Sequence, residues 1–235
     1  MPSATQAGGS PSRLDRSIVV TAALQSIDSF GAQGLTMRKL GHELGVEAMS
    51  LYRYVTGRED LLEAVVAMLL TGLPERLDNK LTRSWQGYLQ SLAHEIRRIA
   101  VDHPNAFPLV ATRHPAAPWL RPPLRSLEVV EDFVSRLSDF GFRDEQIADT
   151  YRSFSSFLLG HLLLEAAVRG ADTSPVEEPV DEGDADVPNR DGRVDLDNSP
   201  NTARLRGLLS EDRSDEEFEA SLENLLDRLE LSLSQ

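Results

Sequence analysis

One short stretch of the chain concentrates side chains of the kinds that contact DNA. The predicted DNA-binding set is Thr36, Arg38, Lys39, Ala48, Met49, Ser50, Tyr52, Arg53, Tyr54 and Arg58. Arginine can pair with guanine edges, small apolar groups can contact thymine methyls, and hydroxyls and arginines can bind phosphate oxygens. We therefore expect residues 48–50, Arg53 and Arg38 to reach base edges. Thr36, Arg58 and the two tyrosines are expected to bind phosphates.

Two short helices joined by a glycine turn would hold these side chains on one surface. Thr36 can cap the first helix, because its hydroxyl can accept an otherwise unpaired backbone N–H. Leu40 and Leu44 give that helix an apolar face, on which Gly41 would let a second helix approach closely. Gly45 suits the sharp turn that follows. Such a pair is a helix-turn-helix, whose second helix fits the major groove of DNA, although the same spacing also occurs in three-helix cores that bind nothing.

The run from Leu14 to Val65 resembles the DNA-binding domain of the tetracycline-repressor (TetR) family of bacterial regulators. The resemblance is carried by the first helix, the GLTMRKL and LGV segments, the LYRYV recognition helix and the REDLL start of a fourth helix. A weaker resemblance to the ligand-binding domain of the tetracycline-repressor group covers Trp85–Ala167, through the segments WQGYL, DHPN, DFGF-DEQ and SSFLLGHLLLEA.

This resemblance implies a homodimer that binds a palindromic operator in double-stranded DNA. In the family, the helices that resemble Asp144–Arg169 and Ser214–Leu231 pair with their copies in a second subunit as a four-helix bundle. Both segments carry the apolar stripes that such a bundle requires. Two recognition helices roughly 34–36 Å apart would then match successive major grooves.

The resemblance also implies a small-molecule pocket between the helices of the second domain. The candidate ligand-binding residues are Trp85, Phe107, Trp119, Phe157 and His161. Each is large enough to line a pocket, but each could equally belong to the core. The family's magnesium-ligating histidine falls at about Val110 and its tetracycline-contacting asparagine at about Leu92. We therefore expect an apolar or aromatic effector and no cofactor.

The helical spacing of apolar residues, with no strand-like alternation, predicts an all-α fold. An N-terminal three-helix helix-turn-helix domain would be followed by a C-terminal helical domain for ligand binding and dimerisation. The predicted segments are a disordered N-terminus (1–12), the DNA-binding domain (13–58), the ligand-binding and dimerisation domain (59–170), an acidic disordered linker (171–200) and C-terminal dimerisation helices (201–235). Pro122 and Pro123 are expected to open a helix, since its first turn has no N–H bond to lose.

Charge is distributed unevenly along the 235 residues, whose formal net charge is −14. Residues 1–58 carry six basic and four acidic side chains, so the acidity lies outside the predicted reading head. The linker alone holds ten acidic residues against Arg190 and Arg193, without the spacing of a calcium loop. No apolar run approaches a membrane span and no secretory signal is recognisable, so we expect a cytoplasmic protein without a membrane partner.

Catalytic and metal-binding motifs are missing from the sequence. The absence of cysteine excludes disulfides and thiolate metal sites. The histidines of the second domain are His94, His103, His114 and His161. With Asp102 and Glu95 nearby they could suggest metal or acid–base chemistry, but none forms an HExxH pair. No nucleophile elbow, Walker loop or dinucleotide fingerprint occurs either. We expect no catalytic residue, no metal site and no enzyme.

The predicted function is a homodimeric repressor that an effector releases from its operator. The fourth helix, expected from Arg58 to Leu70, would be the lever between the two domains. Two alternatives stay open at this point. The chain could be an activator or a co-repressor-dependent regulator, or it could be a ligand-binding module without affinity for DNA.

Overall fold

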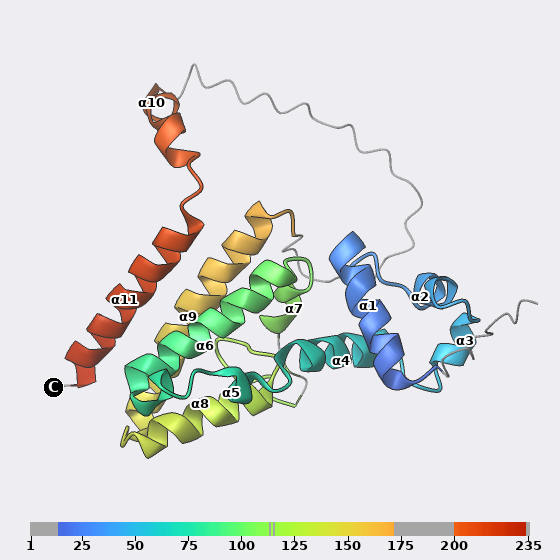
Figure 1. Ribbon diagram of the computed structural model, residues 1–235, viewed down its shortest axis with the longest axis horizontal. Coiled ribbons are helices and arrows are strands. Elements are labelled where there is room, and N and C mark those ends of the chain that lie inside the picture. The colour runs from blue at the N-terminus through green and yellow to red at the C-terminus, as the bar shows by residue number, and fades with distance from the viewer. Residues whose placement is uncertain (1–13, 113, 115, 172–199, 234–235) are drawn as a thin grey trace, which may run out of the picture. The chain divides into compact units, whose positions relative to one another are not determined.

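The structure, a computed structural model, describes residues 14–112, 114, 116–171 and 200–233 (Figure 1). The predicted disordered N-terminus and nearly all of the predicted acidic linker lie outside these residues. The chain divides into two compact units, residues 1–174 and 175–235. The second unit contributes two described helices, α10 (Pro200–Leu209) and α11 (Ser214–Leu233).

The described residues form helices and connecting turns without a strand, which confirms the predicted all-α class. The elements of the first unit are α1 (Arg16–Phe30), α2 (Met37–Glu43), α3 (Ala48–Leu51), α4 (Arg58–Leu70), α5 (Leu73–Arg76), a 3₁₀ turn η1 (Leu81–Arg83), α6 (Trp85–Asp102), α7 (Phe107–Val110), α8 (Leu127–Asp139) and α9 (Asp144–Val168). None of the described helices is long and apolar enough to cross a membrane.

A small N-terminal core holds α1, α2 and α3 together. Asp15 caps α1 by accepting the backbone N–H of Ile18 at 2.9 Å. Ile27 of α1 and Leu40 of α2 are fully buried, as is Leu51 of α3. One buried side chain from each helix therefore fixes this three-helix head.

Helix α4 connects the head to the remaining helices of the first unit (Figure 1). It packs against α1 and also against α7. Its buried residues are Leu61, Leu62, Val65, Val66, Leu69 and Leu70. These residues occupy more than one face of the helix, as a helix that packs on both neighbours requires. A movement of α4 would thus disturb its packing against both α1 and α7.

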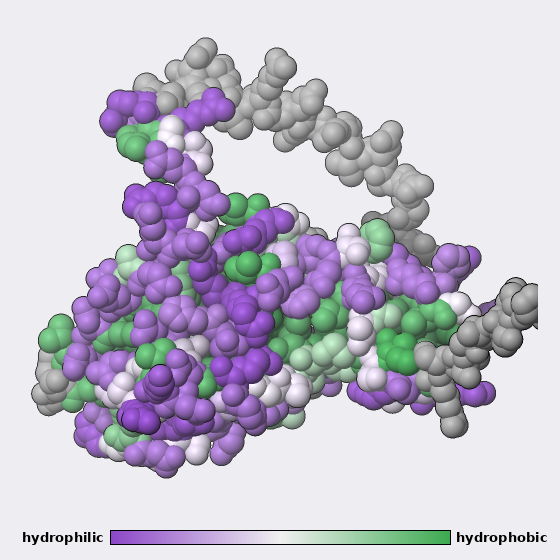
Figure 2. All heavy atoms as spheres, viewed as in Figure 1, coloured by the Kyte–Doolittle hydropathy of each residue, from purple (hydrophilic) through white to green (hydrophobic). Residues whose placement is uncertain are grey.

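Helices α6, α8 and α9 form the main body of the first unit. Ser84 caps α6 by accepting the N–H of Gly87 at 3.1 Å, and the helix ends before Pro104. Helix α9 packs against both α6 and α8. On the face seen in Figure 2 hydrophilic residues predominate, and apolar residues show through around α1 and α4.

The prediction that Pro122 and Pro123 open a helix is wrong. Helix α8 begins at Leu127, where Ser126 caps it by accepting the N–H of Val129 at 3.4 Å. The residues before Ser126 make other bonds: the Pro122 carbonyl accepts the hydroxyl of Tyr151 at 2.9 Å. The hydrogen bond from Tyr151 to Pro122 and the cap at Ser126 thus favour a helix start at Leu127 over one at the prolines.

Candidate functional site

Helices α2 and α3 approach each other closely at the turn between them. The Thr36 hydroxyl caps α2 by accepting the N–H of Lys39 at 3.1 Å. Gly45 has a φ of +67°, which favours glycine. A Cβ added to Gly41 would lie 2.9 Å from the carbonyl oxygen of Val46. The predicted cap and the predicted close approach at Gly41 are therefore both confirmed.

The outer side of this helix pair presents several of the predicted reading residues to solvent. Met49 is 76% exposed and Tyr52 is 47% exposed. Arg38 and Arg53 are exposed as well, whereas Leu51 is buried. Apolar, hydroxyl and basic groups are therefore exposed on this helix pair, while Leu51 packs into the core. Such a surface can contact both phosphates and base edges.

Arg16 holds the end of the recognition segment in place, a role that sequence analysis missed. Its Nη1 donates to the carbonyl oxygen of Tyr54 at 2.9 Å, and its Nη2 donates to Oδ1 of Asp60 at 2.9 Å. Asp60 also accepts the backbone N–H of Thr56 at 2.7 Å. The hydrogen bond from Arg16, helped by the one from Thr56, lowers the pKa of Asp60. Arg16 thereby joins α1, the recognition segment and α4.

The structure gives Arg58 a different role from the predicted phosphate contact. Its Nε donates to the carbonyl oxygen of Leu35 at 3.2 Å, and its Nη2 donates to that of Ala32 at 2.8 Å. The side chain is 19% exposed. Because the guanidinium is occupied by the loop between α1 and α2, we assign Arg58 to the support of the head. Lys39 also has an internal contact, since its ammonium lies 3.1 Å from the centre of the Phe30 ring.

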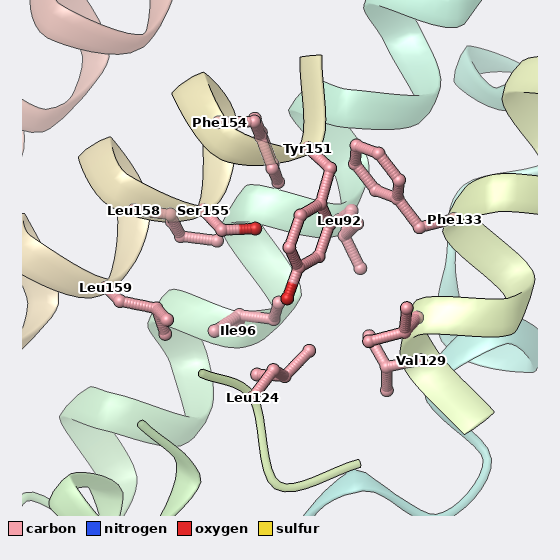
Figure 3. Close-up of a pocket in the computed structure, with 11 residues that line it drawn as sticks. Leu92, Ile96, Leu124, Val129, Phe133, Tyr151, Phe154, Ser155, Leu158 and Leu159 are labelled. Carbon is pink, nitrogen blue, oxygen red and sulfur yellow. The ribbon is translucent and has the colours of Figure 1, made fainter. Parts of the chain in front are cut away.

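A small apolar cavity lies between α6, α8 and α9 (Figure 3). Its lining residues are Leu92, Ile96, Leu124, Val129, Val130, Phe133, Tyr151, Phe154, Ser155, Leu158 and Leu159. Its volume is about 20 Å³, which is room for about one water molecule. An organic molecule could enter only if these helices moved apart.

Tyr151 supplies one of the few polar groups at the cavity. Its aromatic ring extends from α9 and lies among the other lining side chains (Figure 3). Its hydroxyl donates to the carbonyl oxygen of Pro122 at 2.9 Å. Burial raises the pKa of Tyr151 to about 12, although a hydrogen bond with Ser155 opposes this. The hydroxyl therefore stays protonated and can donate at any neutral pH.

The five predicted ligand-binding residues are not brought together. Phe107 is fully buried in α7, and the ring of Trp85 packs edge-on against Phe142 with 5.6 Å between centroids. Phe157 and His161 lie one turn apart on α9, with ring centroids 5.9 Å apart. None of these four is among the cavity-lining residues.

Trp119, the fifth predicted residue, borders a separate surface groove and is 72% exposed. The one cavity residue that the sequence pointed to is Leu92, the position expected for the family's ligand-contacting asparagine. The correspondence with the family's ligand-contacting position thus located the cavity, whereas the choice of residues by their size did not.

Arg125 links the wall of the cavity to α4. It follows Leu124, which lines the cavity, and its side chain is only 7% exposed. Its Nη2 lies 3.3 Å from a carboxylate oxygen of Glu59 and 3.6 Å from one of Glu63. Its Nη1 donates to the hydroxyl of Thr112 at 3.2 Å. Any displacement of the 124–125 segment would therefore act on the first two turns of α4.

The DHPN turn after α6 forms a second link, this time to α1. His103 Nδ1 lies 2.8 Å from Oδ2 of Asp28, and Asn105 Nδ2 donates to the backbone carbonyl of Asp28 at 2.8 Å. His114 is engaged locally, since its Nδ1 accepts the N–H of Ala116 at 3.0 Å. Among the described residues no cluster of three metal-ligating side chains occurs.

Comparison with known proteins places this head and body in one family. Residues 79–233 match the tetracyclin repressor-like C-terminal domain, and residues 19–65 match bacterial regulatory proteins of the tetR family. The chain belongs to the TetR family. Members of this family are DNA-binding, ligand-responsive transcriptional regulators and not enzymes, so the regulator class expected from the sequence is confirmed.

Individual TetR relatives match along most of their length. The class E tetracycline repressor of Escherichia coli is 30% identical over 164 residues, which cover 70% of this chain and 74% of that protein. An HTH-type transcriptional regulator of Saccharopolyspora erythraea is 28% identical over 183 residues, covering 76% of this chain and 74% of that protein. The crystal structure of a possible TetR family regulator from Streptomyces coelicolor A3(2) gives a TM-score of 0.69 at 26% identity, over 93% of this chain and 100% of that one.

Proposed function

We propose that this TetR-family chain is a homodimeric repressor that leaves a palindromic operator when an apolar or aromatic effector opens the α6–α8–α9 cavity. The observation that carries the proposal is the adjacency of Leu124 and Arg125. The first lines the cavity, and the second contacts Glu59 and Glu63 on α4. The proposed effector site and the lever are thus linked through two adjacent residues, of which one lines the cavity and the other contacts α4.

The DNA contacts are proposed for the exposed side of the helix-turn-helix. The proposed set is Thr36, Arg38, Lys39, Ala48, Met49, Ser50, Tyr52, Arg53 and Tyr54, without Arg58. Support comes from the exposure of Met49, Tyr52 and Arg53 on one surface. Side chains of this chemistry can bind phosphates and read bases in the major groove.

The dimer contact is proposed for the outward face of α9. Leu164 is 72% exposed and Val168 is 85% exposed, although both are large and apolar. Phe157 and His161 precede them at helical spacing on the same face, with Gly160 between them. An apolar stripe of this kind on a 25-residue helix can pair with its own copy about a two-fold axis.

Release from DNA follows from the size of the closed cavity. With a volume of about 20 Å³ it cannot hold an organic effector unless α8, α9 or the 124–125 segment moves. Movement of Leu124 would also move Arg125, which contacts the first turns of α4. Helix α4 is in turn connected to the head by the hydrogen bond between Arg16 and Asp60. A ligand that binds only the displaced form would lower operator affinity by its differential affinity for the two forms.

The first experiment is a pull-down of genomic DNA fragments with the full-length protein, followed by footprinting of the enriched fragments. The matched control carries Arg53→Ala with Tyr54→Ala and should keep its oligomeric state while losing enrichment. A palindromic footprint that disappears in the control supports the proposal. If the folded dimer enriches no fragment above the control, the alternative of a ligand-binding module without DNA affinity is favoured. Titration of small molecules into the operator complex then gives the sign of regulation, because a co-repressor would tighten binding.

A further inference from the structure

An open groove of about 480 Å³ lies on the surface beside the closed cavity. Its lining residues are Trp119, Leu120, Arg121, Val130, Val134, Asp144, Ile147, Ala148, Tyr151 and Arg152. The walls come from α8, the first turns of α9 and the segment that precedes α8, and they are mainly apolar. The groove has room for a small organic molecule.

The groove and the closed cavity share two side chains of their walls. Val130 and Tyr151 line both. Tyr151 is held in position by the hydrogen bond of its hydroxyl to the Pro122 carbonyl, at 2.9 Å. If that bond opened and the ring turned, the groove and the cavity would become continuous. The side chain of Tyr151 therefore separates the groove from the cavity, and we refer to it as the latch.

We propose that this groove is the first binding site of the effector and that the effector is an organic anion with an apolar, preferably aromatic, body. The inference rests on the proposed function, since it concerns how a ligand reaches the proposed effector cavity. Trp119 is the surface on which the apolar body lies, because this large side chain is 72% exposed at the groove. The bound molecule then takes the place of the Tyr151 ring as the latch opens.

The acidic group is inferred from the charges at the groove. Two guanidinium groups, those of Arg121 and Arg152, line it together with a single carboxylate, that of Asp144. Arg152 also donates to Oδ1 of Asp149 at 2.8 Å, but both side chains are largely exposed, and exposed pairs of this kind exchange partners at little cost. A carboxylate or sulfonate on the ligand would take the place of Asp149 at Arg152 and would also meet Arg121, in a chain whose overall charge is −14.

The test uses two fluorescent probes that differ mainly in charge: 1-anilinonaphthalene-8-sulfonate and the neutral N-phenyl-1-naphthylamine. The protein is the full chain with Trp85→Phe, which leaves Trp119 as its only tryptophan. We expect the sulfonate probe to quench Trp119 and to bind several-fold more tightly than the neutral one. Arg121→Gln with Arg152→Gln should weaken the sulfonate probe about fivefold and leave the neutral probe unchanged.

Two controls keep the result specific to the groove. Lys80→Gln with Arg83→Gln removes the same amount of charge at exposed positions outside the groove and should not alter binding. Leu81→Ala removes an exposed apolar side chain of η1 outside the groove and should be equally silent. Equal loss in the two charge pairs, or loss with Leu81→Ala and none with Trp119→Ala when binding is followed by the probe's own emission, would overturn the proposal.

The latch is tested by kinetics in the same background. Tyr151→Phe removes only the hydroxyl that donates to Pro122. We expect a rapid first phase of Trp119 quenching that is unchanged and a slower second phase that becomes faster. Two phases with identical rates in both proteins would rule out the latch.

Operator binding separates the failure of this inference from the failure of the proposed function. If the probe binds at Trp119 and DNA affinity is unchanged, the groove is a binding site but its occupation is not transmitted to DNA. If no probe binds while the operator complex responds to another compound, the groove inference is wrong and the proposed function stands.

Discussion

Gly41 lies at the closest approach of α2 and α3, where an added Cβ would be 2.9 Å from the Val46 carbonyl oxygen and 3.1 Å from the Ala48 nitrogen. Both atoms belong to the backbone and cannot turn aside. We expect Gly41→Ala to lower the free energy of unfolding by about 1–3 kcal/mol and to weaken operator binding, because α3 must shift. Chemical denaturation followed by circular dichroism measures the first effect.

Gly207→Ala in α10 is the matched control for that substitution. Its added Cβ would meet nothing within 4 Å, and alanine is favoured in a helix by about 0.5–1 kcal/mol. A Gly41→Ala protein with the same denaturation midpoint and DNA affinity as the parent would contradict the tight contact.

Glu165 is the most buried charge of the body, with a side chain that is 5% exposed. It accepts hydrogen bonds from Arg97 at 2.9 and 3.0 Å, which join α9 to α6, and from Arg169 at 3.1 Å. Burial alone would raise the pKa of Glu165, but the hydrogen bonds from Arg97 and Arg169 outweigh it and hold this pKa below its ordinary value. A carboxylate whose pKa is lower when folded stabilises the fold above its unfolded pKa and loses this contribution as the pH falls through its folded pKa.

Glu165→Gln should therefore destabilise the fold by about 3 kcal/mol at neutral pH, because it replaces the buried carboxylate that accepts from both Arg97 and Arg169 with a neutral amide. It should also flatten the decline of stability as the pH falls from the ordinary range of a glutamate toward the lowered folded pKa, because protonation of the parent carboxylate causes that decline. The measurement is the unfolding free energy at a series of pH values. Glu216→Gln, which breaks an exposed pair with Arg213, should change it by less than about 1 kcal/mol. Equal effects of the two substitutions would show that the buried pair contributes nothing special.

At the scale of elements, α4 is held by arginines from both of its neighbours. Arg16 of α1 contacts Asp60, and Arg125 of the body contacts Glu59 and Glu63. All three carboxylates lie in the first two turns of α4. The first two turns of α4 are thus connected by ion pairs both to the head and to the body.

Arg125→Met keeps the length of the side chain but removes its contacts with Glu59, Glu63 and Thr112. We expect amide hydrogen exchange in the first turns of α4 to accelerate about fivefold, the effect of losing about 1 kcal/mol of local stability. Arg136→Met, which breaks a pair with Asp132 inside α8, should leave α4 unchanged. Unaltered exchange in α4 of the Arg125→Met protein would remove Arg125 from the proposed route.

Sequence patterns predicted the elements better than the faces that those elements present. The Thr36 cap and the Gly41 approach depend on neighbours in the chain, so a pattern of residue types was sufficient. The inward face of α9 depends on where α6 and α8 lie. Phe154 and Leu158 therefore line the cavity, while Phe157, equally apolar and on the same helix, does not.

Long-range hydrogen bonds were the other part that sequence patterns could not give. Arg58 was predicted to bind phosphate because it is basic and close to the recognition helix. Its acceptors, the carbonyls of Ala32 and Leu35, come within reach only when the loop between α1 and α2 has folded. The pairing of Arg16 with Asp60 spans 44 residues and carries no local signature either.

At the scale of the whole molecule, a single head offers few contacts to DNA, and an acidic chain offers little non-specific attraction. We therefore expect useful affinity to depend on the proposed joining of two heads. We expect Leu164→Glu with Val168→Glu to convert the proposed dimer to a monomer, because charges would be buried in the apolar contact. Analytical ultracentrifugation measures the mass, and the slope of log affinity against log salt should fall by roughly half for a single head.

Leu81→Glu is the control for this pair, since Leu81 is 41% exposed in η1, outside α9. It should leave both the mass and the salt slope unchanged. A Leu164→Glu, Val168→Glu protein that remains dimeric would place the subunit contact on another surface.

The position of Arg125 next to Leu124 has a consequence for how such a regulator changes over evolutionary time. In the proposed mechanism the ligand is selected by cavity side chains such as Leu92 and Phe133, which take no part in the contact with α4, and Arg125 takes no part in the lining of the cavity. Substitutions in the lining can therefore alter the accepted molecule while the same arginine reports its arrival. The proposed mechanism therefore makes specificity and response separately mutable, so that new sensors could be drawn from this scaffold by changing the cavity alone.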